Sequence, residues 1–525
     1  MNATSSLTIS VILTILSFMG ILILAVFLRL YNLTKRGLLF WDDGERMCQV
    51  LFLGDLLRFI KDHHGGLKEA DLNANSRQFS GKPLLDCNPL NIFLYYLTSK
   101  IIRNTEYSGL ITNFVFGVLG VIGVFFAGTV MFDYKVGLIA CLVLSVSGYH
   151  LMYSRSVFSE ITCGAFYIWA TYFYYLSYST GNIFYLALSG LLVGCAFCSN
   201  SRQFYIPAFF IIYEIVRWSI QGPEFFFMRI VILGISMLSP LLLIESFFIV
   251  LRIFGYPYQT FFHQLYGLSR NYEPLDFRFP FLRMYVETFY CTEGLPILCL
   301  VVVGIIYLSF NWSFVSVILF FQFLVPLIFW SVRSNAKGSE EYSRPRFMSS
   351  SLYAMAIIVA AGITILPEYL LYPLIFIVII SGIRNSLKIL KVKSGYKKAI
   401  DFINSHGNGK HFTFSRAISQ FYVGNDKAEF NSLYSSEEKF KEAYAVKDVR
   451  YLLYVKSIHV NTFKGRIGAN RVLEEILRTL KPVYSVELGM GQFKPFYWDE
   501  HNNPNLTVFN SNLIEVFDLS QFFRN

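Results

Sequence analysis

The chain of 525 residues is far more apolar than a soluble protein of that length. Hydrophobic residues make up 54% of it and only 15% are charged, against about 25% in a typical soluble domain. The net charge of +10 is scattered over loops and a basic tail, without the clustered basic stripe of a nucleic-acid-binding surface. Composition therefore excludes a soluble enzyme and a nucleic-acid partner. It predicts an integral, multi-pass α-helical protein in contact with membrane lipids.

The first apolar run extends from Leu7 to Leu28 and is long enough to cross a bilayer. No Lys or Arg precedes it and no small-residue cleavage site follows, so we expect a retained helix rather than a signal peptide. A long polar loop over 29–108 comes next. It contains an amphipathic stretch from Arg46 to Phe59 and a short apolar one from Pro89 to Ile102, both typical of helices lying at the membrane surface.

Further apolar runs predict, together with the first, about eleven transmembrane helices within residues 1–385. If the N-terminus is cytoplasmic, alternation of these spans places the long first loop and most polar loops on the extracytoplasmic side. Arginines in short outer loops weaken this orientation, but functional arginines can outweigh the positive-inside bias. The runs are 109–131, 136–152, 157–178, 183–199, 203–220, 229–252, 295–310, 312–332, 350–366 and 369–384.

The composition changes near Ser394, where helical and strand-like patterns begin to alternate. This alternation predicts a small α/β soluble domain over 386–525, which we expect on the extracytoplasmic side. No glycine-rich phosphate loop is present, which favours a structural or acceptor-docking role. The predicted helices are Glu437 to Ala445 and Arg471 to Leu480, and the strands are His411 to Phe414, Val449 to Val455, Val483 to Glu487 and Leu513 to Phe517.

Three carboxylates crowd the chain just after the first span, at Asp42, Asp43 and Glu45. Carboxylates this close repel one another, so they need cations, a metal ion or a polar ligand nearby. One of them could act as a general base on an acceptor hydroxyl. Asp43 and Glu45 could instead hold a divalent metal ion. The plain alternative is a solvated acidic cap on a membrane helix.

The order of the polar motifs resembles that of the GT-C superfamily of polyprenyl-phosphate-sugar-dependent glycosyltransferases. The resemblance is strongest to the branch of protein O-mannosyltransferases and aminoarabinose transferases, and it covers residues 7–385. The motifs, in order, are Asp42-Asp43-Gly44, Lys82-Pro83, Asn88-Pro89-Leu90, Arg155 with Glu160, Ser199-Asn200-Ser201-Arg202, Glu293-Gly294-Leu295-Pro296 and Arg344-Pro345-Arg346-Phe347.

The resemblance implies a GT-C fold and an inverting transfer of sugar from a polyprenyl-phosphate donor to a glycan, lipid or protein acceptor. It implies that Asp42 is the general base and that Asp43 assists it. Asp43 stands where the family usually has Glu, and Asn88-Pro89-Leu90 lacks one of two usual prolines. It also implies an extracytoplasmic active site, which we expect in a bacterial or archaeal cell membrane.

Basic residues of these motifs are candidates for binding the donor phosphate. Arg344 and Arg346 are the first choice, because a guanidinium binds phosphate through two parallel hydrogen bonds. They could alternatively anchor lipid headgroups, and Arg155 could pair with Glu160 to brace a loop. The predicted substrate-binding set is Glu45, Lys82, Arg155, Glu160, Arg202, Arg344 and Arg346.

Two functions from other classes compete with the glycosyltransferase. A non-catalytic, GT-C-like scaffold subunit of a membrane complex is favoured by the shorter second carboxylate and the missing proline. A transporter is disfavoured, because the sequence shows no paired halves with Gly- or Pro-interrupted helices.

Overall fold

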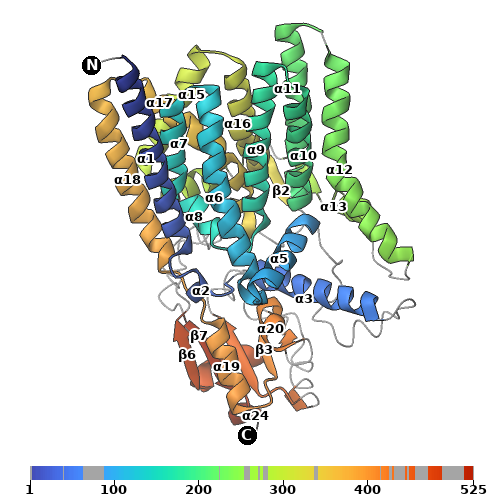
Figure 1. Cartoon of the computed structure of the whole chain (residues 1–525). Coiled ribbons are helices and arrows are strands. Elements are labelled where there is room, and N and C mark those ends of the chain that lie inside the picture. Colours follow the sequence, from blue (N-terminus) through green and yellow to red (C-terminus); the bar gives the residue numbers. More distant parts are fainter. Residues whose placement is uncertain are drawn as a thin grey trace.

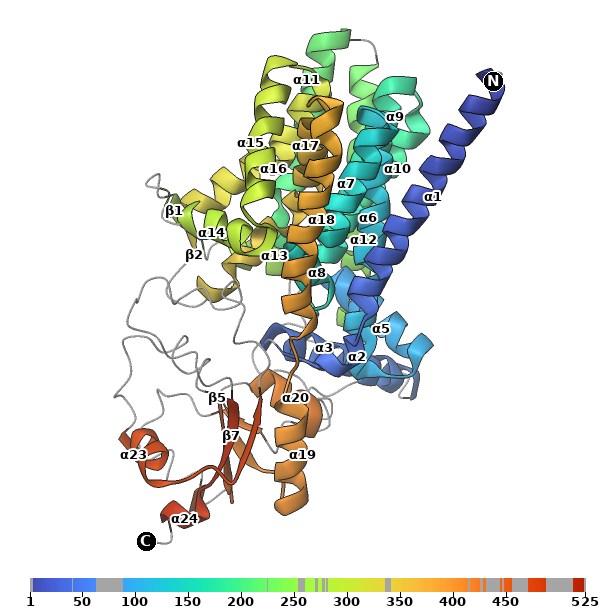
Figure 2. The same cartoon turned by 90° about the vertical axis from the view of Figure 1, so that its left-hand side faces the viewer.

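Figure 1 shows the computed structural model, in which a bundle of long helices stands on a smaller unit containing a β-sheet. The structure describes residues 3–39, 41–62, 88–223, 225–253, 260–269, 272–275, 279, 282–335, 341–413, 416–424, 428–430, 444–445, 448–455, 471–487 and 513–523. Figure 2 shows that α18 runs down the bundle and leads into the smaller unit.

The helices of the bundle are strongly apolar. Six helices among the described residues are long and apolar enough to cross a membrane, or up to eight if each of two bent pairs is one span. The predicted multi-pass membrane protein is confirmed, and the number of about eleven spans stays a prediction. The long helices that form the bundle, whether or not each meets these criteria alone, are α1 (Ala3–Leu30), α6 (Thr105–Met131), α7 (Tyr134–Val146), α9 (Ser159–Thr180), α10 (Ile183–Ser199), α11 (Tyr205–Gln221), α12 (Phe226–Ile253), α15 (Leu295–Phe310), α16 (Phe314–Val332), α17 (Leu352–Thr364) and α18 (Glu368–Leu390).

Two pairs of helices are bent, and one of the two bends lies inside a run that the sequence predicted as a single span. The run 136–152 is divided at Ser147, after which α8 (Gly148–Ser154) leaves α7 at 62°. Helix α14 (Leu282–Glu293) meets α15 at 117°. The predicted span over 136–152 is therefore not one continuous helix, because the Ser147 hydroxyl accepts a hydrogen bond from the backbone N–H of His150 at 3.1 Å and caps a new helix. Whether the bent pair forms one span stays a prediction.

Short elements gather at the end of the bundle that faces the β-sheet. The predicted surface helices coincide with α3 and α5, and α3 lies across the ends of the long helices (Figure 1). These elements are α2 (Leu33–Arg36), α3 (Trp41–Asp62), α5 (Pro89–Ile102), α13 (Phe261–Ser269), the 3₁₀ helices η1 (Ser201–Gln203) and η2 (Glu341–Ser351), and the paired strands β1 (Tyr272–Leu275) and β2 (Arg333–Asn335).

The smaller unit contains a five-stranded mixed sheet with the order β4-β3-β5-β7-β6. Strand β3 is parallel to β4 and β5, and β7 is antiparallel to β5 and β6. Of the predicted helix Glu437 to Ala445, only the last two residues are described. The domain limits and the side of the membrane stay predictions. The elements are α19 (Tyr396–His406), β3 (His411–Thr413), α20 (Arg416–Val423), β4 (Ala428–Phe430), β5 (Tyr451–Val455), α23 (Arg471–Thr479), β6 (Tyr484–Glu487), β7 (Leu513–Asp518) and α24 (Ser520–Phe523).

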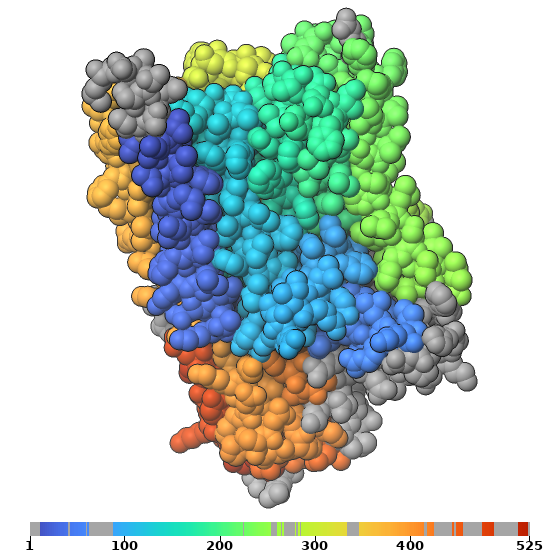
Figure 3. Space-filling model, viewed as in Figure 1, coloured from blue at the N-terminus to red at the C-terminus, as the bar shows by residue number. Residues whose placement is uncertain are grey.

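Helix α20 packs directly on α3, and the space-filling view shows α19 and α20 closing against the end of the bundle (Figure 3). A Cβ atom on Gly44 would lie 2.4 Å from the backbone nitrogen of Ile418, so only glycine permits this approach. At the edge of the contact, Glu106 accepts hydrogen bonds from Lys397 Nζ and the Tyr422 hydroxyl, both at 2.8 Å. The smaller unit is thus fastened beside the acidic sequence 42–45.

Candidate functional site

Asp42 and Arg346, which are 304 positions apart in the chain, form an ion pair. Asp42 lies in the first turn of α3, and Arg346 lies in η2. The Asp42 side chain is 24% exposed, whereas that of Arg346 is only 4% exposed. The structure thus brings together the predicted base and one of the two preferred phosphate ligands, and leaves the carboxylate accessible.

The Arg346 side chain is fixed between acidic and aromatic groups. Its Nε lies 3.4 Å from Glu160 Oε1, in the first turn of α9. The guanidinium carbon lies 5.1 Å from the ring centre of Phe158 and 5.7 Å from that of Phe347. Arginine favours such aromatic faces. One guanidinium therefore joins Asp42 and Glu160, two acids that the sequence placed in separate motifs.

Three arginines determine the charge state of Asp42. Burial alone would raise the pKa of this carboxyl, but the charges of Arg346, Arg46 and Arg202 outweigh burial and hold the pKa well below its usual range. Arg46 was not among the predicted site residues. Its spacing of four residues from Asp42, one turn along a helix, is the sequence signal that indicates it.

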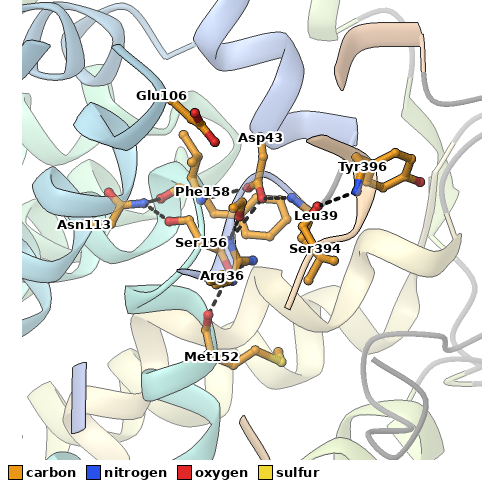
Figure 4. A network of polar contacts seen from close by, with 12 residues as sticks. Arg36, Leu39, Asp43, Glu106, Asn113, Met152, Ser156, Phe158, Ser394 and Tyr396 are labelled. Atoms are coloured by element: carbon orange, nitrogen blue, oxygen red, sulfur yellow. Dashed lines mark hydrogen bonds and ion pairs between the residues drawn. The ribbon is translucent and has the colours of Figure 1, made fainter. Parts of the chain in front are cut away.

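Asp43 has surroundings quite unlike those of Asp42. It is fully buried, and Figure 4 shows it at the centre of a polar network. Its Oδ1 accepts a hydrogen bond from the Val157 backbone N–H at 2.8 Å. Its Oδ2 accepts from the Leu39 backbone N–H at 2.9 Å and from Arg36 Nη1 at 3.3 Å. Both carboxylate oxygens are thus engaged with the protein.

The network continues into the turn between α8 and α9. Arg36 Nη2 donates to the Ser156 hydroxyl at 2.9 Å. Asn113 Nδ2 donates to the carbonyl oxygens of Ser156 and Phe158 at 2.5 and 2.7 Å. Buried hydrogen bonds from α2, α3 and α6 therefore hold the turn that precedes Glu160 (Figure 4).

Arg155 contacts the end of α1 rather than Glu160. Its Nη1 donates to the carbonyl oxygens of Leu28, Arg29 and Tyr31 at 3.2, 2.8 and 2.8 Å, and its side chain is 1% exposed. A cation at the C-terminal end of a helix is favoured by the helix dipole. The alternative pairing of Arg155 with Glu160 is therefore wrong, because Glu160 contacts Arg346.

The remaining predicted site residues differ in how far the structure describes them. Arg202 lies near the site, with its guanidinium carbon 5.8 Å from the centre of the Phe347 ring. Glu45 is buried, at 3% exposure. Lys82 and the side chain of Arg344 lie outside the described residues, so their predicted contacts stay predictions.

A metal site formed by Asp43 and Glu45 does not fit the structure. Both oxygens of Asp43 accept hydrogen bonds from protein donors, one of them a guanidinium. Within the described ranges, no group of three or more His, Cys, Asp and Glu side chains could hold a metal ion.

Comparison with known proteins supports one fold. Residues 83–244 match the family model described as dolichyl-phosphate-mannose-protein mannosyltransferase. No curated protein sequence matches the chain significantly.

Solved membrane enzymes share the architecture at low sequence identity. The apo structure of ArnT from Cupriavidus metallidurans has a TM-score of 0.58 at 10% identity, over 91% of this chain and 96% of that one. The oligosaccharyltransferase AglB from Archaeoglobus fulgidus, with an inhibitory peptide and a dolichol-phosphate, has a TM-score of 0.54 at 11% identity, over 87% of this chain and 72% of that one. A complex of the A. fulgidus enzyme with Zn and sulfate has a TM-score of 0.53 at 12% identity, over 87% and 70%. Together with the family-model match, these likenesses confirm the predicted fold, that of the GT-C glycosyltransferases.

Proposed function

We propose that this protein is a membrane glycosyltransferase that moves a sugar from a polyprenyl-phosphate donor to an acceptor hydroxyl with inversion. One observation carries the proposal: a partly exposed carboxylate, Asp42, lies among the guanidinium groups of Arg346, Arg46 and Arg202. A sugar-phosphate transfer needs this combination, since a base takes the acceptor proton and cations stabilise the departing phosphate.

The structural neighbours support a lipid-linked donor. ArnT and AglB share the fold, and the AglB structure contains a dolichol-phosphate. Helices such as α12 expose apolar side chains, including Phe227 and Leu243, that suit contact with lipid tails. We propose a glycan, lipid or protein acceptor and an extracytoplasmic active site, in the membrane of a bacterial or archaeal cell.

The chemistry assigns different roles to the two adjacent aspartates. Asp42 takes the proton of the acceptor hydroxyl while the acceptor oxygen forms a bond to the anomeric carbon. The bond from that carbon to the phosphate oxygen breaks on the opposite face, and the arginines meet the charge of the departing phosphate. Asp43, with both oxygens engaged, we assign to positioning the turn at Val157 rather than to catalysis.

Arg346 has two tasks in this mechanism. While it is paired with Asp42, it holds the pKa of that carboxyl too low for an effective base. A donor phosphate would compete for the guanidinium, and the partial release of Asp42 would raise its pKa toward a useful value.

We propose that Arg155 caps α1 instead of binding phosphate, because its described contacts are all with backbone carbonyls. Since the Asp43–Glu45 metal site does not fit, we assign no metal ion to these two carboxylates.

The test is a transfer assay with the purified protein in lipid nanodiscs and a panel of polyprenyl-phosphate sugars and acceptors. Asp42→Asn should lower transfer by about 10³-fold or more, because it removes the base, and should leave the melting temperature near that of wild type. Asp55→Asn on the same helix is the control, since Asp55 is 43% exposed and pairs only loosely with Arg58 at 4.0 Å.

The results also separate the proposed enzyme from the scaffold. A folded wild-type protein that transfers no sugar from any lipid-linked donor would favour the scaffold. Full activity of Asp42→Asn would show that another group is the base.

A further inference from the structure

Glu293 lies where the two bent helix pairs meet. It is the last residue of α14 and is fully buried. Its Oε1 accepts hydrogen bonds from the Ser147 hydroxyl and from the Tyr149 backbone N–H, both at 2.9 Å. One carboxylate oxygen therefore accepts both hydrogen bonds from the start of α8, at the break that follows α7.

Helix α18 ties the two breaks together. The Ser381 hydroxyl donates to the backbone carbonyl of Glu293 at 3.1 Å, and the Ser386 hydroxyl donates to the carbonyl of Val146 at 3.1 Å. A Cβ atom on Gly148 would lie 2.6 Å from the carbonyl oxygen of Thr292, so the backbones of the two breaks are nearly in contact. The start of α8 has little freedom to shift while these contacts hold.

The far end of α8 leads into the proposed active site. All seven of its residues are buried, so packing on every side keeps the helix rigid and a shift at its start would move its end. Immediately after it, Arg155 contacts the end of α1 and the Val157 N–H contacts Asp43. Glu160 follows, and its Oε1 lies 3.4 Å from Arg346 Nε. Helix α8 is thus held by Glu293 at its start and by Asp43 just beyond its end.

We infer that Glu293 is a positioning residue for sugar transfer: by fixing the start of α8, it sets the turn that aligns Glu160 and Arg346 beside Asp42. The inference rests on the proposed function. Glu293 touches no reacting group, and its effect is transmitted through the rigid α8. Small errors of alignment are costly, since a displacement of about 1 Å can lower a rate by about 10²-fold.

The contacts of Glu293 predict how substitutions should behave. Glu293→Ala leaves the Tyr149 N–H and the Ser147 hydroxyl without their carboxylate partner. Glu293→Gln keeps an oxygen at the Oε1 position, and the described contacts of Oε2 include no hydrogen bond that the amide group would break. Ser147→Ala leaves Glu293 in place but removes one of its two contacts, together with the hydroxyl that accepts from the His150 N–H at the start of α8.

The experiment compares kcat and the donor KM of these variants in the nanodisc assay, per folded molecule. Glu293→Ala should lower kcat by about 30- to 100-fold with the donor KM within about threefold of wild type, because alignment rather than binding is lost. Glu293→Gln should restore kcat to within about threefold. Ser147→Ala should lower kcat by about 3- to 10-fold, and it replaces Glu293→Ala if that variant does not fold.

Glu214→Gln is the matched control. Glu214 is also fully buried and accepts from Arg217 Nε at 2.9 Å and from Arg229 Nη2 at 2.7 Å. It belongs to α11, which continues into α12 at the end of the bundle away from α3 (Figure 1). Its substitution should affect folding and leave the kcat of folded molecules unchanged.

Three results would overturn the inference. The first is a wild-type kcat in Glu293→Ala or in folded Ser147→Ala. The second is a kcat of Glu293→Gln that is as low as that of Glu293→Ala. The third is a loss of kcat in Glu214→Gln equal to that in Glu293→Ala. An inactive wild-type protein would instead count against the proposed function, so the two failures are distinguishable.

Discussion

Replacing Asp43 with Asn should damage stability more than chemistry, although Asp43 adjoins the proposed base. Three described donors contact Asp43: the backbone N–H groups of Leu39 and Val157 and the guanidinium of Arg36. An Asn side chain offers one acceptor oxygen and one NH₂ group. In either amide orientation, at least one buried donor would therefore face another donor.

The contacts set the size of the expected loss. Arg36 and Asp43 are 3% and 0% exposed, so solvent screens their ion pair very little. Removing one partner of such a buried pair costs about 3–5 kcal/mol, and this range includes the lost charge-assisted hydrogen bond. We expect Asp43→Asn to destabilise the protein by about 3–5 kcal/mol.

The assay combines unfolding in detergent with transfer measured per folded molecule at low temperature. Asp43→Asn should melt well below wild type while its folded fraction keeps much of its transfer activity. Asp42→Asn, at the more exposed neighbouring position, should show the opposite: near-normal melting and no transfer. A folded Asp43→Asn protein with normal melting and no transfer would refute the separation of roles and return Asp43 to the chemistry.

Two further predictions concern the smaller unit. Gly44→Ala should displace α20, because the new Cβ would lie 2.4 Å from the Ile418 nitrogen. Limited proteolysis should then cleave the smaller unit faster than in wild type. Gly20→Ala is the control and should not change the cleavage rate, because no atom lies within 4 Å of the added Cβ. Burial lowers the pKa of His411 to about 4, against about 6.5 in the unfolded chain, so only the unfolded state gains this proton as the pH falls from 6.5 to 4. The free energy of unfolding should therefore decrease over that interval by at most about 3 kcal/mol. Thermal unfolding at several pH values should show that His411→Asn removes this part of the pH dependence. His406→Asn, at an exposed position, is the control and should not remove it.

The helices were the most predictable part of the fold, because their signal is local. The predicted runs 183–199 and 295–310 coincide with α10 and α15, and the amphipathic stretch from Arg46 to Phe59 lies inside α3. The break at Ser147 was not predictable in the same way. Serine is common in membrane helices, and the acid that fixes this break, Glu293, is 146 positions away.

The site was predictable only in part, for a related reason. Charged side chains in ordered motifs indicated Asp42 and Arg346, and the structure pairs them. The role of Asp43 depends instead on a backbone N–H, that of Val157, which carries no sequence signal. The spacing of Arg155 and Glu160 likewise suggested a pair, but a helix end and a distant arginine provide nearer partners.

The contact between α20 and α3 has a consequence for the order in which the protein is made. Helix α3 leaves the ribosome early, yet the surface at Gly44 receives its partner only after residue 418 has been synthesised. Strand β7, which lies between β5 and β6, comes later still. During translation, the helix that carries Asp42 thus lacks this contact until the final fifth of the chain is made, and premature termination in that region would leave the start of α3 without its partner α20.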